Sequence, residues 1–235
     1  MTVSVALAAY NGEKYIAEQL NSVLKQLSLQ DEVVISVDPS KDATKQICLD
    51  KAAHDSRIKV LDGKGQGLIK NFENAVKSCT GDIIMLCDQD DIWLDGKTDR
   101  VKEEFQNSDI LLCMHNARVV DGDLNTENES FFSVRGTGTG IVKNIIKNTY
   151  MGCCMAFRNE AKKYILPFPD NLPMHDQWIG LVCEKRGKVS LIDEPLILYR
   201  RHSDNASSDT HAGFVQMLKW RINIVSALFK NGRGE

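Results

Sequence analysis

The stretch VSVALAAYNGEKYIAEQLNSVLKQ, residues 3–26, contains the change of pattern that decides the fold class. Its first seven residues form an apolar run with the length of a buried β-strand, and Asn11-Gly12 is a turn signal that ends it. The apolar residues that follow recur at the three- and four-residue spacing of an amphipathic helix: Ile16, Leu20, Val23, Leu24 and Leu27. The stretch therefore predicts a strand, a turn and a helix.

The same alternation continues through the first half of the chain. Further strands are predicted at residues 33–37, 58–61 and 83–87, and further helices at residues 44–53 and 68–79. Strands separated by amphipathic helices favour right-handed crossovers, which place parallel strands in one sheet with helices on both faces. We therefore predict an α/β fold whose first half is Rossmann-like, with a mainly parallel sheet.

The second half of the chain is less regular. A charged helix is predicted at residues 97–105 and a strand at residues 110–114, whereas residues 121–140 are polar and glycine-rich and predict a mobile loop. The proline-rich stretch LPFPDNLPMHDQW, residues 166–178, predicts irregular backbone. Shorter elements are predicted at residues 153–157, 160–165, 189–192 and 196–199.

Composition limits the class of protein. The 235 residues are 43% hydrophobic, which is enough for one domain with a full core, and the net charge of −3 does not favour a nucleic-acid partner. No apolar run is long enough to span a bilayer, and the first residues lack the basic region of a signal peptide. The seven cysteines contain no Cys-x-x-Cys pair. We therefore expect a cytoplasmic protein whose thiols serve mainly as small core residues, Cys87, Cys113 and Cys183 among them.

Three carboxylates follow the fourth predicted strand in LCDQDDIW, residues 86–93. Two carboxylates about 6 Å apart repel by roughly 3 kcal/mol at an effective dielectric constant of about 20. Mg²⁺ and Mn²⁺ take oxygen ligands, commonly one or two protein carboxylates together with substrate phosphates. Asp88 and Asp90 therefore predict a metal site, and the alternative is a solvated acidic turn that caps the next helix. Asp91 has no assigned role beyond orienting the loop or capping that helix.

Polar residues also follow the first two predicted strands. Tyr10 comes after the first strand and Asp38 after the second. Because the carboxyl ends of parallel strands meet at one edge, where open α/β sheets bind ligands, we expect both residues to line the same edge as the acidic cluster. A dinucleotide motif is not indicated, because DGKGQG lacks the third glycine and predicts a turn.

Several motifs, in order along the chain, resemble the inverting family-2 glycosyltransferases of the GT-A fold. They are VSVALAAYNGEKYIAEQLNSVLKQ, VVISVDPSKDAT, GLIKNFENAVKSCTGDIIMLCDQDDIW, MGCCMAFRNEA and HDQWIGL. The combination of DQDDIW with LPFP…HDQW…G…EPLILYRRHSDNAS is similar to the bacterial rhamnosyltransferase-like branch. The resemblance covers residues 3–207. It implies a single GT-A domain over residues 1–210, with a nucleotide-sugar-binding half (1–118), a less regular acceptor half (119–210) and a C-terminal helix within residues 211–235.

The resemblance implies a donor-binding set at the nucleobase. Tyr10 would lie against the face of the base, Asp38 would accept a hydrogen bond from its ring N–H, and Gln89 belongs to the same set. Two positions depart from the family pattern: Ala8 stands where the family has a small hydroxyl residue, and Pro39 follows Asp38 where a second acidic residue is usual. The donor can therefore carry uridine or thymidine.

The resemblance also implies roles at the diphosphate and the metal. Asp88 would meet the ribose or the Mn²⁺ or Mg²⁺ ion, and Asp90 would ligate that ion. Lys70 would face the nucleotide phosphates or the aspartate cluster, with an ordinary surface position as the alternative. His202 would complete the metal shell or contact the diphosphate, with a structural role as the alternative.

For the reaction, the resemblance implies that Asp176 is the general base. It would take the proton of an acceptor hydroxyl while the nucleoside diphosphate leaves from the opposite face of the sugar, which inverts the anomeric carbon. The alternative is that Asp176 caps a helix, and His175 is then the first neighbour to test. The acceptor implied is a glycan, lipid-linked, used in bacterial surface polysaccharide synthesis.

Two other classes of protein compete with this interpretation. One is a non-catalytic subunit that binds a nucleotide sugar, although the presence of both the acidic cluster and Asp176 argues against it. The other is a sugar nucleotidylyltransferase, which needs a glycine-rich phosphate loop after the first strand, and YNGEKY lacks that composition.

The end of the chain, GFVQMLKWRINIVSALFK, predicts a basic amphipathic helix. Its apolar stripe consists of Phe214, Leu218, Ile222, Val225 and Phe229. Such a helix can lie on an anionic membrane, here the inner face of the plasma membrane, or pack on the catalytic domain or on a second subunit. The sequence does not decide among these.

Overall fold

The computed structural model describes residues 1–202 and 213–231, and all structural statements below refer to them. One sheet runs through the molecule in the strand order β3-β2-β1-β4-β8-β6-β9-β5, with β7 beside β6. The strands are β1 (Val3–Ala9), β2 (Glu32–Val37), β3 (Ile58–Asp62), β4 (Ile83–Cys87), β5 (Ile92–Trp93), β6 (Ile110–Val120), β7 (Thr126–Asn128), β8 (Met155–Arg158) and β9 (Lys188–Arg200). The α-helices are α1 (Ile16–Leu24), α2 (Thr44–His54), α3 (Leu68–Ser78), α4 (Lys97–Glu104), α5 (Phe131–Arg135), α6 (Ile141–Ile146), α7 (Lys162–Ile165), α8 (His175–Arg186) and α9 (Phe214–Lys230).

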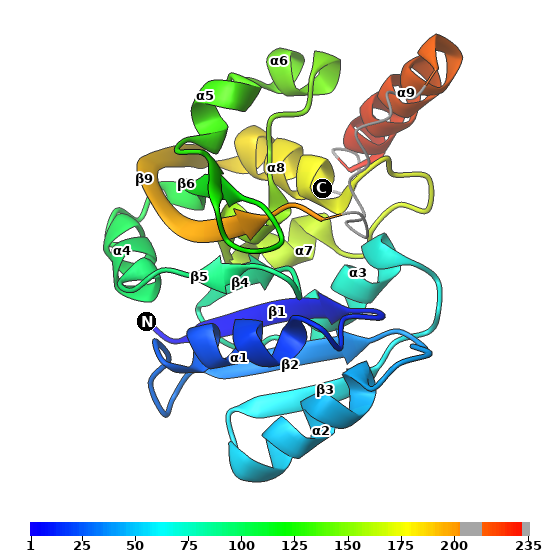
Figure 1. The fold of residues 1–235 in the computed structure, drawn as a ribbon. Coiled ribbons are helices and arrows are strands. Elements are labelled where there is room, and N and C mark those ends of the chain that lie inside the picture. The colour runs from blue at the N-terminus through cyan, green and yellow to red at the C-terminus, as the bar shows by residue number, and fades with distance from the viewer. Residues whose placement is uncertain (203–212, 232–235) are drawn as a thin grey trace.

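The first half is a parallel βαβ unit, as predicted. Strands β3, β2, β1 and β4 are all parallel neighbours, and every residue of β1 and β4 is buried. The connections from β1 to β2 and from β2 to β3 run in one direction across the sheet, so right-handed crossovers place α1 and α2 on one face. The connection from β3 to β4 runs back and places α3 on the other face (Figure 1). The change of direction lies beside β1 and β4.

The second half extends the same sheet with mixed directions. β8 is antiparallel to both β4 and β6, while β6 and β9 are parallel. The strand predicted at 110–114 continues to Val120, and the two strands predicted at 189–192 and 196–199 are the single strand β9. The residues Asp193, Glu194 and Pro195 do not end the strand, because β9 stays paired with β6 on both sides of them. Pro195 lies at a register shift in that pairing, where a proline can be accommodated.

Two segments predicted to lack regular structure contain helices. Residues 121–140 include β7 and α5, so the prediction of one mobile loop was wrong there. The proline-rich stretch is irregular only as far as Met174, and α8 begins at His175. The first nine residues of α8 are all buried, so the helix has no amphipathic stripe to reveal it in the sequence. All seven cysteines are buried and free, which confirms the prediction that they are core residues.

The C-terminal helix α9 packs on its own domain, but not through the predicted stripe. Ile224 and Leu228 are buried and Val225 is partly buried, whereas Leu218, Ile222 and Phe229 are exposed. The predicted stripe also includes Phe214, whose side chain lies outside the described set. None of the described helices is both long and apolar enough to cross a membrane. The sequence motif that ends at residue 207 also continues beyond the described residues.

Candidate active site

The carboxyl ends of β1, β2 and β4 form one edge of the sheet, and the predicted polar residues meet there. Ala8 pairs with Ser36 and Leu7 with Cys87, so the three strands end side by side. The Asp38 backbone N–H donates to the Ala9 carbonyl over 2.9 Å, which holds the residues after β1 and β2 together. The predicted common edge is therefore confirmed.

Tyr10 is held at this edge through its backbone. The Tyr10 N–H donates to Gln89 Oε1 over 2.9 Å, and Gln89 Nε2 donates to the Tyr10 carbonyl over 3.0 Å. A Cβ added at Gly12 would overlap the Gln89 amide, so the glycine leaves room for this pair of bonds. The Tyr10 side chain itself is 53% exposed. The ring is thus presented to solvent on a fixed backbone, and Gln89 connects it to the acidic cluster.

Asp38 is buried beside a glycine turn. The Gly65 N–H donates to Asp38 Oδ1 over 3.0 Å, and a Cβ added at Gly63 would overlap the same oxygen. Ala8 is buried as well, and Asn71 on α3 donates to the neighbouring Ala9 carbonyl over 3.1 Å. The stretch DGKGQG is therefore a turn, as predicted, and one function of that turn is to hold Asp38.

The acidic cluster brings three carboxylates together in a buried place, where burial and mutual repulsion disfavour their charged forms. Burial, together with the charges of Asp90 and Asp176, raises the pKa of Asp88 to about 7. Burial also raises the pKa of Asp91 well above its usual range, and the charges of Asp90 and Asp88 act in the same direction. Burial raises the pKa of Asp90, although the neighbouring His202 lowers it in part. A bound cation would relieve all three effects.

The donor atoms around the cluster fit a divalent cation. Oxygens of Asp88 and Asp91 and the Cys153 Sγ all lie within 4.8 Å of one another. Asp91 Oδ2 is buried and has no hydrogen-bond partner among the described residues. Hard cations take such carboxylate oxygens. Asp91, to which the sequence assigned no ligand role, therefore belongs with Asp88 at the candidate metal site.

The residues at and just after the end of β9 contact the acidic cluster. His202 Nε2 lies 3.0 Å from Asp90 Oδ2, and its ring stacks on Tyr15 with centroids 4.6 Å apart. The Arg200 backbone N–H donates to Asp91 Oδ1 over 3.1 Å. The structure thus brings His202 to Asp90, and the adjacent backbone fixes Asp91. The stacking partner Tyr15 and the Arg200 contact were not foreseen, because nothing in the sequence indicates pairing across more than a hundred residues.

Lys97 is another residue that the sequence did not reveal. It is buried at the start of α4, where Nζ donates to the Cys153 carbonyl over 3.1 Å and lies 4.0 Å from the centre of the Trp93 ring. Burial lowers the pKa of Lys97, while the neighbouring cysteines, Cys154 first, and then Asp91 raise it in part. A lysine in the first turn of a helix is unfavourable to the helix dipole, and that is the one signal in the sequence that could have pointed to it.

Lys70 lies away from the aspartate cluster. Its Nζ forms ion pairs with Glu73 Oε2 at 2.8 Å and Asp170 Oδ1 at 3.1 Å, and donates to the Phe168 carbonyl over 3.0 Å. Of the two contacts predicted for Lys70, the one with the aspartate cluster is therefore not present in the structure. Its contact with nucleotide phosphates stays a prediction.

Asp176 lies in the first turn of α8 and faces the same site. Asn148 Nδ2 donates to Asp176 Oδ1 over 3.2 Å, and the Gln177 N–H donates to the same oxygen over 2.5 Å. Burial raises the pKa of Asp176 to about 6, although these hydrogen bonds lower it in part. Because the Asp176 charge acts on Asp88, the two carboxylates share one electrostatic environment. A carboxylate with a pKa near neutral suits proton transfer at the pH of the cell.

The neighbouring His175 is packed against the core, and its role as the alternative base stays a prediction. Its ring is buried and stacks on Phe72 with centroids 4.1 Å apart. A Cβ added at Gly152 would lie 2.9 Å from His175 Nε2, so the glycine makes room for the ring. Burial lowers the pKa of His175 to about 3, which keeps the imidazole neutral.

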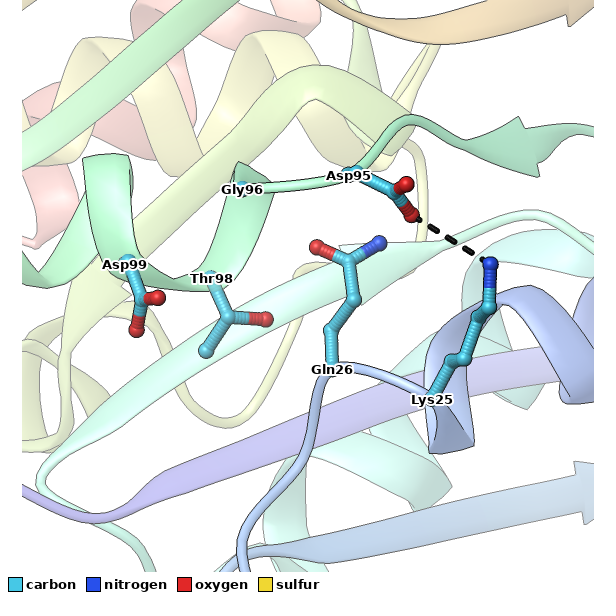
Figure 2. Close-up of a pocket in the computed structure, with 6 residues that line it drawn as sticks. All are labelled: Lys25, Gln26, Asp95, Gly96, Thr98 and Asp99. Carbon is cyan, nitrogen blue, oxygen red and sulfur yellow. Dashed lines mark ion pairs between the residues drawn. The ribbon is translucent and has the colours of Figure 1, made fainter.

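A separate hollow of about 340 Å³ lies between the end of α1 and the start of α4 (Figure 2). It is lined by Lys25, Gln26, Asp95, Gly96, Thr98 and Asp99. Helix α1 starts near the carboxyl end of β1 and runs back along it, so the hollow is at the opposite edge of the sheet from the acidic cluster. Its one ion pair, Lys25 Nζ to Asp95 Oδ1 at 3.6 Å, joins two exposed side chains and contributes little stability.

Comparison with known sequences matches most of the chain to one family. The model of glycosyl transferase family 2 matches residues 4–166. The chain is 29% identical to the dTDP-rhamnosyl transferase RfbG of Shigella flexneri, over 85% of this chain and 72% of that protein. It is 26% identical to the UDP-Glc:alpha-D-GlcNAc-diphosphoundecaprenol beta-1,3-glucosyltransferase WfgD of Escherichia coli, over 88% of this chain and 80% of that protein. It is 28% identical to the uncharacterised glycosyltransferase alr2836 of Nostoc sp. over 87% of this chain, but spans only 66% of that protein.

Comparison with solved structures confirms the fold. The crystal structure of S. aureus TarS residues 1–349 in complex with UDP-GlcNAc superposes with a TM-score of 0.77 at 22% identity. The match covers 97% of this chain and 66% of the TarS fragment. The predicted GT-A fold, with a Rossmann-like sheet and a less regular second half, is therefore confirmed.

Proposed function

We propose, since the chain belongs to glycosyl transferase family 2, that it transfers a sugar from a UDP- or dTDP-linked donor to a hydroxyl group of a glycan acceptor with inversion. One observation carries the proposal: two kinds of carboxylate meet at the carboxyl edge of the sheet. The cluster of Asp88, Asp90 and Asp91 is suited to a cation, and Asp176 stands apart on α8 with a pKa raised to about 6.

Different residues at the carboxyl edge of the sheet would bind different parts of the donor. The exposed Tyr10 ring would lie on the base, and buried Asp38 would accept its ring N–H. Asp88 and Asp91, with Asp90 held by His202, would bind a Mn²⁺ or Mg²⁺ ion. When bound, the ion supplies positive charge that stabilises the leaving diphosphate.

Asp176 would perform the proton transfer. Its carboxylate is oriented by Asn148 and by the Gln177 N–H in the first turn of α8, which both donate to Oδ1. As the hydroxyl oxygen attacks the anomeric carbon, its proton passes to Asp176 and the diphosphate leaves from the opposite face. A single displacement of this kind inverts the configuration of the sugar.

The acceptor that we propose is a lipid-linked glycan used in bacterial surface polysaccharide synthesis, and the name of one relative, WfgD, supports the lipid-linked acceptor. The name of RfbG specifies a dTDP-rhamnosyl donor, and that of WfgD specifies UDP-Glc and a diphosphoundecaprenol acceptor. The departures from the family pattern at Ala8 and Pro39 leave both uridine and thymidine possible, so a UDP-linked and a dTDP-linked donor both agree with the sequence.

The test is a panel of nucleotide sugars with Mn²⁺, first by thermal shift and then by turnover. The proposal expects one UDP- or dTDP-sugar to raise the melting temperature and to release nucleoside diphosphate when an acceptor is added, with an inverted product by NMR. Donor binding without turnover on any lipid-linked or soluble glycan would favour the non-catalytic subunit. Release of pyrophosphate from a nucleoside triphosphate and a sugar phosphate would instead indicate a nucleotidylyltransferase.

A further inference from the structure

Helix α9 presents an apolar stripe that its own domain does not cover. The exposed residues Val215, Leu218, Ile222 and Phe229 recur at helical spacing along one side, and Ile222 and Phe229 are 59% and 68% exposed. The buried residues Ile224 and Leu228 lie on a different side of the same helix. The helix is therefore docked and still exposes a second hydrophobic side.

The neighbouring helix α6 extends this surface. Arg221 Nη2 on α9 donates to the Ile146 carbonyl at the end of α6 over 2.7 Å, and Arg221 is three positions from Leu218 on the helix. The stripe on α9 thus runs beside α6, whose Val142 and Ile146 are 71% and 61% exposed. We call the exposed apolar residues of these two helices the α6–α9 face: Val142, Ile146, Val215, Leu218, Ile222 and Phe229. Both helices lie in the upper part of Figure 1, away from β3 and α2.

The charged residues within the two segments that carry the α6–α9 face all have one sign. Residues 131–149 and 214–231 contain no aspartate or glutamate. Their six cations are Arg135, Lys143, Lys147, Lys219, Arg221 and Lys230. The chain as a whole has a net charge of −3, so this basic region is a local asymmetry and not a property of the composition.

We infer that the α6–α9 face is a docking surface for an anionic lipid bilayer. Exposed apolar side chains on helices whose charged residues are all lysine or arginine are the combination that enters the boundary between headgroups and acyl chains. Association with a second copy through the same face would bring the six cations of each copy together, and that like-charge contact disfavours a symmetric dimer.

The α6–α9 face lies near the proposed base, so a membrane contact there would affect how the acceptor reaches the site. Two residues after α6, Asn148 donates to Asp176, so the segment that contains α6 also contacts the proposed base. A bilayer against the α6–α9 face would therefore deliver a membrane-embedded acceptor to the side of the site where Asp176 lies. This last step rests on the proposed function, whereas the membrane contact does not.

The experiment is vesicle flotation of the full chain with phosphatidylglycerol-containing and pure phosphatidylcholine vesicles, at low and high salt. We expect binding to the anionic vesicles only, weakened by salt. Leu218→Ser/Ile222→Ser should weaken it by about 100-fold, because each inserted apolar side chain contributes roughly tenfold. Lys219→Gln/Lys230→Gln should weaken it by about 25-fold and reduce the salt dependence.

Matched controls come from α2, at the other end of the molecule. Leu49→Ser replaces an exposed apolar helical residue and Lys45→Gln/Lys51→Gln removes two charges, and neither should change vesicle binding. All substituted side chains on α9 are exposed, and unchanged circular dichroism will verify the fold. The thermal shift with nucleotide should also be unchanged, which separates a failure here from a failure of the proposed function.

Three results would overturn the inference. The first is absence of wild-type flotation with anionic vesicles, and the second is equal flotation of the double variants and wild type. The third is a wild-type dimer by light scattering that Leu218→Ser/Ile222→Ser converts to a monomer without any vesicle binding by either protein. In that case the face is a contact between copies of this chain.

Discussion

Replacing Asp88 by asparagine should remove a pH-dependent cost from the metal-free protein. The pKa of Asp88 is raised from 3.8 to about 7 in the folded state, mainly by burial. The folded protein therefore binds a proton that the unfolded chain releases, so the contribution of Asp88 to stability is greatest below pH 4 and is lost as the pH rises through about 7. The cost is about 2 kcal/mol at pH 5 and about 4 kcal/mol at pH 8, a loss of about 2–3 kcal/mol over that interval.

The assay is urea unfolding in the presence of a chelator at pH 5 and pH 8. Between these two pH values, wild type should lose about 2–3 kcal/mol more unfolding free energy than Asp88→Asn. Asp95→Asn is the matched control, because the Asp95 side chain is 86% exposed and the same charge change there should leave the wild-type pH dependence in place. Excess Mn²⁺ at pH 8 should stabilise wild type by about 2.7 kcal/mol when it exceeds its dissociation constant a hundredfold, and should stabilise Asp88→Asn far less.

The reasoning is refuted if wild type and Asp88→Asn show the same change in unfolding free energy between pH 5 and pH 8. That outcome would mean that water already screens the carboxylates of the cluster. It would favour the alternative interpretation, in which the cluster is a solvated acidic turn and not a metal site. A change that appears in Asp95→Asn as well would point to net charge instead of the buried site.

Three further predictions concern the donor-binding edge. Asp90→Ala should make the affinity for UDP or dTDP independent of Mn²⁺ in calorimetry, and a wild-type affinity that is the same with Mn²⁺ and with chelator would contradict the metal role. Tyr10→Ala should leave unfolding free energy within about 0.5 kcal/mol of wild type but weaken nucleotide binding about tenfold, because the exposed ring contributes only through the base. Gly12→Ala should displace the Gln89 amide and break its two hydrogen bonds to Tyr10, which should lower unfolding free energy by about 1–2 kcal/mol and weaken nucleotide binding, whereas Gly122→Ala has open space and should do neither.

The first half of the fold was predictable because local pattern and burial agree there. The strands β1 and β4 have the predicted bounds, since each is a short apolar run closed by a turn or by charged residues. In the second half, tertiary contacts override the local pattern. The strand β9 continues through Pro195 because β6 lies beside it, and α8 is buried on all sides in its first turns, so neither shows its usual periodicity.

The candidate site was predictable where residues follow strand ends. Tyr10, Asp38 and Asp88 meet at one edge because parallel strands bring their carboxyl ends together. The contacts that complete the site join distant segments, such as Asp90 with His202 and Asp91 with the Arg200 backbone, and depend on the path of β9. The buried Lys97 and the pairing of Lys70 away from the cluster depend in the same way on tertiary packing.

The most direct test of the account is the transfer rate of Asp176→Asn at saturating donor, measured with donor affinity and melting temperature on the same preparation. Asparagine preserves the size of the side chain and most of its capping ability, but it cannot accept the proton. If Asp176 is the general base, donor affinity and melting temperature will stay near wild type, while the transfer rate will fall by about 10²–10⁴. A variant that retains more than about a tenth of the wild-type rate would contradict it, because loss of a positioned base should cost at least about 10².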